Sequence, residues 1–354
     1  MANIDAFLWL MLEQRASDLL FMAGQQPVLR IDGELLPINY RSITSDECLN
    51  FIFEILPDNK QEKFKKTLDI DFSYQLEEQA RFRVNLFQHR LGPGATFRLI
   101  PTRIPSIEEI NLPLQLMNFT ILQEGLILVS GPAGNGKSTT VAALIDCISN
   151  NSSRYIMTIE NPIEFTFKSK KSLVIQREIG HCIDSYEAGL QGILRSNPDV
   201  ILIGELNNTT VIDIALSAAQ TGSLVFSTLN SQSCVDAISR LIDSFPPSEQ
   251  ARIRNSLAIS LKGVINQKLV RRLNYRGRVP IVELLNESPE LSDIIRQGTI
   301  QQLRTCFDSD HTSMNISVDQ SLMHLYTKEL ISLETAMAHA AKPEIFESMT
   351  IKPF

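Results

Sequence analysis

Residues 131–138 read Gly131-Pro132-Ala133-Gly134-Asn135-Gly136-Lys137-Ser138 and match GxxxxGK[ST], the pattern of a loop that binds phosphate groups. We call them the phosphate loop. The apolar run Leu126–Val129 before the loop predicts a buried parallel strand, and Ser138–Ile148 after it has helical periodicity. In that setting the glycines turn backbone N–H groups towards a β-phosphate, Lys137 reaches the β- and γ-oxygens, and the Ser138 hydroxyl ligates Mg²⁺. The pattern therefore predicts a site for a nucleoside triphosphate, with Mg²⁺ as the metal.

A second candidate residue lies at the end of another apolar run, Asp199-Val-Ile-Leu-Ile203-Gly-Glu205. Ligands of open α/β sheets bind at the carboxyl edge of the strands, so Glu205 is expected near the γ-phosphate. From there it can orient the attacking water or a water bound to Mg²⁺. Glu205 is therefore a predicted catalytic residue.

Apolar strands alternate with helices from residue 114 onward, which is typical of a doubly wound parallel sheet. From about Pro246 the pattern is helical, with an interruption near Asn274–Val282. The expected elements before that point are strands at Leu126–Val129, Tyr155–Ile159, Val200–Ile203 and Leu224–Phe226 and a helix at Thr209–Thr221.

Residues 1–100 predict a small α+β domain with an antiparallel sheet. We expect an amphipathic helix over 4–20, a hairpin of Val28–Ile31 and Glu34–Leu36 around Asp32-Gly33, and a helix at Ser45–Leu56. Further strands are expected at Ile70–Leu76, Arg81–Gln88 and Ala95–Ile100, with Gly92-Pro93-Gly94 as a turn. Residues 101–113 hold three prolines and suit a linker, which leaves 114–354 as the second domain.

Composition describes an ordinary folded protein of 354 residues, with 44% hydrophobic and 21% charged residues. A net charge of −7 gives no overall attraction to nucleic acid, so a motor that acts on DNA is disfavoured. The five cysteines form no CxxC pair, which favours reduced thiols in a cytosolic protein. The apolar run Ala6–Leu12 lacks a basic flank and is short, so we expect no direct membrane insertion.

The chain resembles the secretion and pilus ATPases, and most closely the pilus-retraction ATPases of type IV pili, from about Ala16 to its C-terminal helices. The matching stretches are Gly131–Thr139, Thr158–Phe165, Gln176–Gly180, Pro198–Glu205, Ala218–Gly222 and Arg240–Pro246. The resemblance implies that Glu160 and Glu164 of the acidic box are catalytic together with Glu205. It also implies nine consecutive nucleotide-binding residues: Gly131, Pro132, Ala133, Gly134, Asn135, Gly136, Lys137, Ser138 and Thr139.

The resemblance further implies a PAS-like N-terminal domain that swivels on a RecA-like ATPase domain with a helical C-terminal region. In this family arginines of the N-terminal domain reach the nucleotide, and Arg83 and Arg98 are the matching candidates. The family also implies a homo-hexamer, or a mixed hexamer with a paralogous ATPase. Such a ring would act on an inner-membrane pilus platform protein from the cytoplasmic face of that membrane, to power twitching motility.

The chain departs from the family pattern at the periphery of the site. Asn161 stands where an aspartate is usual, and Thr228-Leu229-Asn230 stands where the family has Thr-Leu-His. Asn230 can hydrogen-bond a phosphate oxygen or a water, but it cannot become cationic or shuttle a proton as histidine can. Two other functions therefore stay open: an accessory, weakly active or inactive subunit that works with an active paralogue, and a pilus assembly or type II secretion ATPase.

Overall fold

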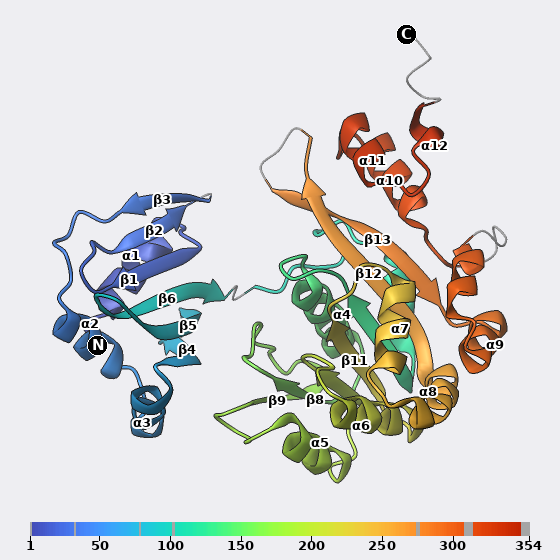
Figure 1. The fold of residues 1–354 in the computed structure, drawn as a ribbon, viewed down its shortest axis with the longest axis horizontal. Helices are drawn as coiled ribbons and strands as arrows, with labels where there is room; N and C mark the ends of the chain where they lie inside the picture. The colour runs from blue at the N-terminus through green and yellow to red at the C-terminus, as the bar shows by residue number, and fades with distance from the viewer. Residues whose placement is uncertain are drawn as a thin grey trace. The chain divides into compact units, whose positions relative to one another are not determined.

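The computed structural model describes residues 2–31, 33–77, 79–100, 103–273, 277–307 and 314–347. The chain divides into two compact units, and each is described by itself below (Figure 1). The N-terminal unit comprises Met1–Arg103 with Pro162–Thr166, and the C-terminal unit comprises Ile104–Asn161 with Phe167–Phe354. The domain boundaries expected from sequence, 1–100, 101–113 and 114–354, stay a prediction.

In its described residues the N-terminal unit is built on a six-stranded antiparallel sheet of order β3-β2-β1-β6-β5-β4. The strands are β1 (Asp18–Met22), β2 (Val28–Ile31), β3 (Glu34–Pro37), β4 (Asp69–Leu76), β5 (Ala80–His89) and β6 (Gly92–Ile100). The helices of this unit are α1 (Asp5–Glu13), α2 (Ser45–Phe53) and α3 (Asp58–Thr67). The antiparallel sheet and the β2–β3 hairpin predicted from sequence are confirmed, with Asp32 outside the described residues.

Two expectations for this unit are wrong. The helix predicted over residues 4–20 ends at Glu13, because Arg15 has a left-handed φ of 54° that a helix does not accommodate, and β1 follows. The glycines of Gly92-Pro93-Gly94 do not form a turn; they lie inside β6, and the turn falls at Arg90-Leu91. Gly92 has a φ of 133°, and a Cβ there would lie 2.7 Å from Ser45 Oγ, so close packing against α2 requires this glycine.

The second helix of the unit begins as its sequence suggests. Thr44 caps α2 by accepting from the backbone N–H of Glu47, whose side chain accepts from the backbone N–H of Thr44 in return, a capping box. The helix ends at Phe53, three residues before the expected Leu56, and α3 follows without having been predicted. Pro57 is the N-cap of α3 and has an extended backbone. Most residues of α3 are polar, and Phe64 is its one buried residue.

In the part of the C-terminal unit that the structure describes, a seven-stranded sheet has the order β13-β12-β7-β11-β10-β8-β9. All neighbours are parallel except β12 and β13. The parallel strands are β7 (Gly125–Ser130), β8 (Tyr155–Glu160), β9 (Leu173–Glu178), β10 (Val200–Ile203), β11 (Leu224–Leu229) and β12 (Leu261–Arg271). The four strands predicted from sequence are confirmed, and so are the helices after the phosphate loop and after residue 208, α4 (Lys137–Asn151) and α6 (Thr209–Gln220).

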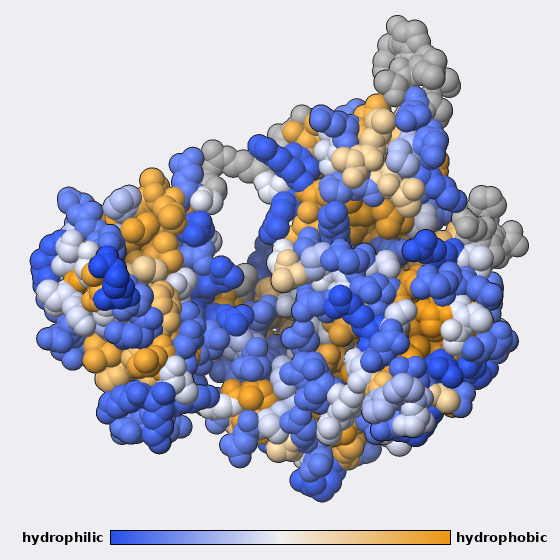
Figure 2. All heavy atoms as spheres, viewed as in Figure 1, coloured by the Kyte–Doolittle hydropathy of each residue, from blue (hydrophilic) through white to orange (hydrophobic). Residues whose placement is uncertain are grey.

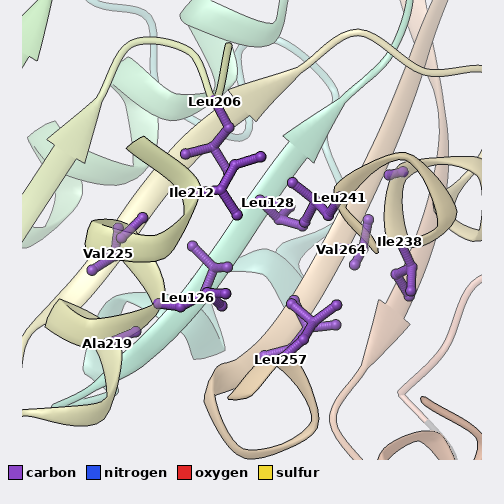
Figure 3. Close-up of a cluster of buried hydrophobic side chains, with 14 of the residues drawn as sticks. Leu126, Leu128, Leu206, Ile212, Ala219, Val225, Ile238, Leu241, Leu257 and Val264 are labelled. Carbon is purple, nitrogen blue, oxygen red and sulfur yellow. The ribbon is translucent and has the colours of Figure 1, made fainter. Parts of the chain in front are cut away.

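Helices pack against the central sheet and form a large hydrophobic core with its strands. Leu126 and Leu128 of β7 pack with side chains of α6, α7 (Cys234–Asp243) and α8 (Pro247–Ser260), as Figure 3 shows. Helix α5 (Tyr186–Leu194) joins the same core, whereas α4 lies outside that cluster and contacts β7 and β11. Hydrophilic residues predominate on the molecular face drawn in Figure 2.

The sequence pattern predicted a helical region after Pro246 with one interruption, but the structure contains two long strands there. After α8 the chain forms β12 and the antiparallel edge strand β13 (Arg278–Asn286), so the predicted interruption belongs to a hairpin, with Asn274–Arg276 outside the described residues. The hairpin is favoured over a helix because β12 pairs with β7 and buries Val264 and Ile265 completely. The remaining helices are α9 (Pro289–Gln297), η2 (Ile300–Phe307), α10 (Val318–Thr327), α11 (Leu333–His339) and α12 (Glu344–Glu347), with η1 (Leu114–Ile121) before β7.

Candidate nucleotide-binding site

The phosphate loop joins the fully buried strand β7 to helix α4. Gly131 has a φ of 144°, and a Cβ on it would lie 2.2 Å from the backbone oxygen of Gln267, so only glycine fits there. Gly136 adopts a left-handed φ of 81° as the N-cap of α4, and no side chain caps this helix end. The N–H groups of the first turn of α4 are therefore oriented as in sites that bind phosphate.

Lys137 is folded back over the loop that precedes it. Its Nζ donates to the carbonyl oxygens of Gly131 at 2.9 Å and of Pro132 at 3.0 Å, and to Asn230 Oδ1 at 2.8 Å. Asn135 Nδ2 braces the same loop by donating to the carbonyl oxygens of Pro132 and Ala133. The ammonium group is thus held over the loop, where an anionic ligand would compete for it.

Asn230 links the lysine to the strand-end carboxylate. Its Nδ2 donates to Glu205 Oε1 at 2.9 Å, and its backbone oxygen accepts from Arg240 Nη1 at 3.0 Å. Glu205 follows β10 and Asn230 follows β11, and these strands are parallel neighbours whose carboxyl ends meet at one sheet edge. The structure therefore brings Lys137, Asn230 and Glu205 together in one chain of hydrogen bonds.

Glu160 ends β8, the next strand along the same edge. It is 8% exposed, and its Oε1 accepts from Thr158 Oγ1 at 2.7 Å and from Gln176 Nε2 at 3.1 Å. Glu164 is half-buried and belongs to Pro162–Thr166, the segment that groups with the N-terminal unit, and Asn161 is exposed. Of the two predicted acidic-box carboxylates, Glu160 therefore lies on the sheet that carries the phosphate loop, and Glu164 does not.

Arg83 and Arg98 lie directly opposite each other on β5 and β6 of the N-terminal unit. Like charges in register destabilise a sheet unless each is neutralised. Arg98 Nε pairs with Asp18 Oδ1 at 2.9 Å, and Arg83 Nε lies 3.8 Å from Asp71 Oδ1. The arginine side chains remain 70% and 41% exposed, respectively, so solvent and solutes reach both of them.

The family model for type II/IV secretion system proteins matches residues 2–330. The chain belongs to this family. It is 38% identical to the type IV pilus retraction ATPase PilT of Pseudomonas aeruginosa over 94% of this chain and 97% of that protein. It is 32% identical to the type IV pilus ATPase PilU of the same organism over 96% of this chain and 88% of that protein.

A solved structure carries the likeness to the level of the fold. The crystal structure of the pilus retraction motor PilT with bound ADP superposes with a TM-score of 0.89 and 35% identity, covering 99% of this chain and all of that one. The fold class expected from sequence, an N-terminal α+β unit followed by a RecA-like unit with a parallel sheet, is confirmed. This member of the type II/IV secretion family is a P-loop ATPase that uses a nucleotide.

Several residues that contact the candidate site of this secretion-family chain were not predicted from its sequence. Gln176 lay in a stretch that resembled the family but received no role, and the structure places its amide on Glu160. Arg240, for which no role was predicted, likewise contacts the site by donating from Nη1 to the backbone oxygen of Asn230. Strand β12 lies against the phosphate loop but was predicted to be helical. No motif in its sequence indicates that its side chains contact the loop.

Ser138 is the residue predicted from the motif to ligate Mg²⁺. Ser138 and Thr139 are half-buried in the first turn of α4. Within the described ranges no group of three or more histidine, cysteine, aspartate or glutamate residues stands ready to hold a metal ion. The same ranges contain no helix long and apolar enough to cross a lipid bilayer.

Proposed function

We propose that this chain is the ATP-hydrolysing subunit of a hexameric motor that powers type IV pilus retraction, and thereby twitching motility. The observation that carries the proposal is the hydrogen-bonded chain Lys137–Asn230–Glu205, which joins a phosphate-binding cation to a strand-end carboxylate. The 38% identity of this protein to a PilT retraction ATPase over nearly its whole length supports retraction as the movement that the motor drives. The motor would act on an inner-membrane platform protein from the cytoplasmic face of that membrane.

Each residue of the site has a role that its chemistry permits. ATP supplies the phosphoryl group whose transfer to water releases the free energy that drives the motor. Lys137 and the backbone N–H groups of residues 133–139 stabilise phosphate charge, and the Ser138 hydroxyl ligates Mg²⁺. Glu205 orients the attacking water, while Glu160 and Glu164 support the reaction as further carboxylates. The uncapped N-terminus of α4 and the glycine backbone fit such an anion.

Arg83 and Arg98 complete the site from the N-terminal domain of a neighbouring subunit. Their exposure leaves both guanidinium groups available, and their register makes a pair of cations that one anion can bridge. A ring of subunits would then hydrolyse ATP only where neighbours meet. Swivelling of the N-terminal domain on the ATPase domain is the motion that we assign to the power stroke.

Activity is expected to depend on assembly. Because a neighbour supplies arginines, the hydrolysis rate should rise faster than linearly with protein concentration below the assembly threshold. The doubly substituted Arg83→Ala/Arg98→Ala protein should assemble but hydrolyse slowly at every concentration. Particle mass and steady-state rate measured in the same samples test this, and a rate strictly proportional to concentration from a verified monomer would contradict it.

An accessory role is the second candidate, and Asn230 is the observation that favours it. Where the family has a histidine, Asn230 binds both Lys137 and Glu205 and cannot carry a proton. Similarity to a PilU ATPase, alongside similarity to PilT, fits a subunit that shares a mixed hexamer with an active paralogue. This reading predicts nucleotide binding with little turnover by the isolated protein.

Asn230→Ala is expected to lower kcat by about ten- to a hundredfold, because hydrogen bonds to charged groups contribute about 1.5–3 kcal/mol. The substitution frees both Lys137 and Glu205 from their shared partner. Its KM for ATP should change less, since Lys137 keeps two carbonyl acceptors. Steady-state kinetics check this, with Asn151→Ala as control, because exposed Asn151 bonds only within its own helix. An unchanged kcat in Asn230→Ala would remove Asn230 from the mechanism.

A further inference from the structure

Gln267 of β12 lies against the phosphate loop from outside the sequence motif. Its side chain is 3% exposed, and both ends of the amide are used. Nε2 donates to the backbone oxygen of Asn135 at 2.7 Å, and Oε1 accepts from Thr140 Oγ1 of α4 at 2.6 Å. One buried amide thus connects the loop, the helix that follows it and the neighbouring strand.

Two further groups of the β12–β13 hairpin bind the same part of the loop. The backbone N–H of Leu269 donates to Asn135 Oδ1 at 2.8 Å, and Arg278 Nη1 donates to the backbone oxygen of Gly134 at 3.3 Å. We call Gln267, Leu269 and Arg278 the hairpin clamp. The clamp fixes both the backbone and the side chain of Asn135.

Close packing shows how tightly β12 and the loop approach each other. A Cβ at Gly131 would lie 2.2 Å from the Gln267 backbone oxygen, and a Cβ at Gly136 would lie 2.8 Å from Gln267 Nε2. The first and last glycines of the motif therefore both lie against one residue of β12. Their small size is what allows the loop to lie on this strand.

We propose that Gln267 is a positioning residue that orients the phosphate loop for nucleotide binding. The Asn135 oxygen and the Gly136 N–H belong to one planar trans peptide group, in which C=O and N–H point in opposite directions. When Gln267 holds that oxygen towards β12, the Gly136 N–H points away from β12 and is free to meet a phosphate. Gln267 acts through Asn135 without touching the ligand, and the inference rests on the proposed nucleotide site.

Gln267→Met tests this role, since methionine keeps the length and apolar fit of the chain but makes neither hydrogen bond. The Kd for ADP, measured by calorimetry, is expected to rise about tenfold, the factor that a loss of 1.4 kcal/mol produces. KM for ATP should rise with it, and kcat should change less, because a misoriented loop weakens ground and transition states alike. Asn135→Ala, at a half-buried position of the loop, removes the hydrogen bond from the Leu269 N–H to Asn135 Oδ1. It should also raise the Kd for ADP, without altering the hydrophobic core.

Thr140→Val is the matched control. It removes the other hydrogen bond of the same amide at a fully buried position, but leaves the bond from Gln267 to Asn135. We expect its melting temperature to fall as in Gln267→Met, with the Kd for ADP within about twofold of the unsubstituted protein. The contrast separates loop orientation from general stability.

Two results would overturn the role of Gln267. One is a Kd for ADP that stays unchanged in both Gln267→Met and Asn135→Ala while the unsubstituted protein binds ADP. The other is a parallel loss of ADP affinity in Gln267→Met and Thr140→Val that follows their melting temperatures. Absence of ADP binding by the unsubstituted protein would overturn the nucleotide site itself, and this role with it.

Discussion

Lys137→Ala is expected to lose most of the affinity for nucleotide, with a Kd for ATP raised by about a hundredfold, which corresponds to roughly 2.7 kcal/mol. The lysine supplies the only side-chain cation of residues 131–139, and in the structure its Nζ is already held over the loop by three acceptors. Alanine removes this charge from the phosphate site and leaves the loop backbone in place. Equilibrium titration with a fluorescent ATP analogue measures the change.

Lys170→Ala is the control for that experiment, because it also removes one lysine of the ATPase domain. Lys170 pairs with Asp146 of α4 and is expected to leave the Kd for ATP unchanged. Retained affinity in Lys137→Ala, with a melting temperature equal to that of the unsubstituted protein, would contradict the assignment of residues 131–138 as a phosphate site.

Glu205→Gln is expected to preserve ATP binding and to lower kcat by roughly 10²–10⁴-fold, the usual contribution of a positioned acid–base group. Glutamine keeps the size of the side chain and its oxygen for the hydrogen bond from Asn230 Nδ2, but it carries no charge to orient water. The effect should therefore appear in kcat, with KM for ATP nearly unchanged. Steady-state phosphate release gives both constants.

Glu124→Gln makes the same chemical change at the opposite edge of the sheet, just before β7, where Glu124 is exposed. Its kcat should equal that of the unsubstituted protein. Undiminished turnover in Glu205→Gln would exclude the catalytic role given to Glu205, and Glu160 would become the next carboxylate to test.

Local chemistry made much of the fold predictable from sequence. The phosphate loop has a fixed motif, and the strands that flank the site are short, wholly apolar runs such as Val200–Ile203, which are typical of buried parallel strands. The β2–β3 hairpin follows from a turn residue whose backbone needs a positive φ, Gly33 at 93°. These elements carry their own signals.

The parts that sequence did not predict depend on distant partners. Strand β12 has polar and apolar residues that suit a helix equally well, and it becomes a strand because β7 lies beside it. Gly92-Pro93-Gly94 has the composition of a turn, yet it packs within β6 against other parts of the unit. Tertiary contacts decided both cases.

The candidate site shows the same division. Lys137, Ser138 and Glu205 could be named as candidates from the motif and the strand end, because each lies next to the element that positions it. The link through Asn230 joins residues 93 positions apart, and the bond from Gln267 spans 132 positions, so neither is visible in a single sequence. Spacing alone offered no way to find either contact.

Steady-state Mg-ATP hydrolysis by the purified protein, with particle mass recorded in the same samples, would decide whether this chain is the subunit of a working motor. We expect turnover by a hexamer, and in Glu205→Gln a kcat lowered by roughly 10²–10⁴-fold at an unchanged ATP affinity. Such a result would also show that Asn161 and Asn230 are compatible with activity. ATP binding without turnover by the assembled, unsubstituted protein would contradict the proposed motor and place the accessory subunit first.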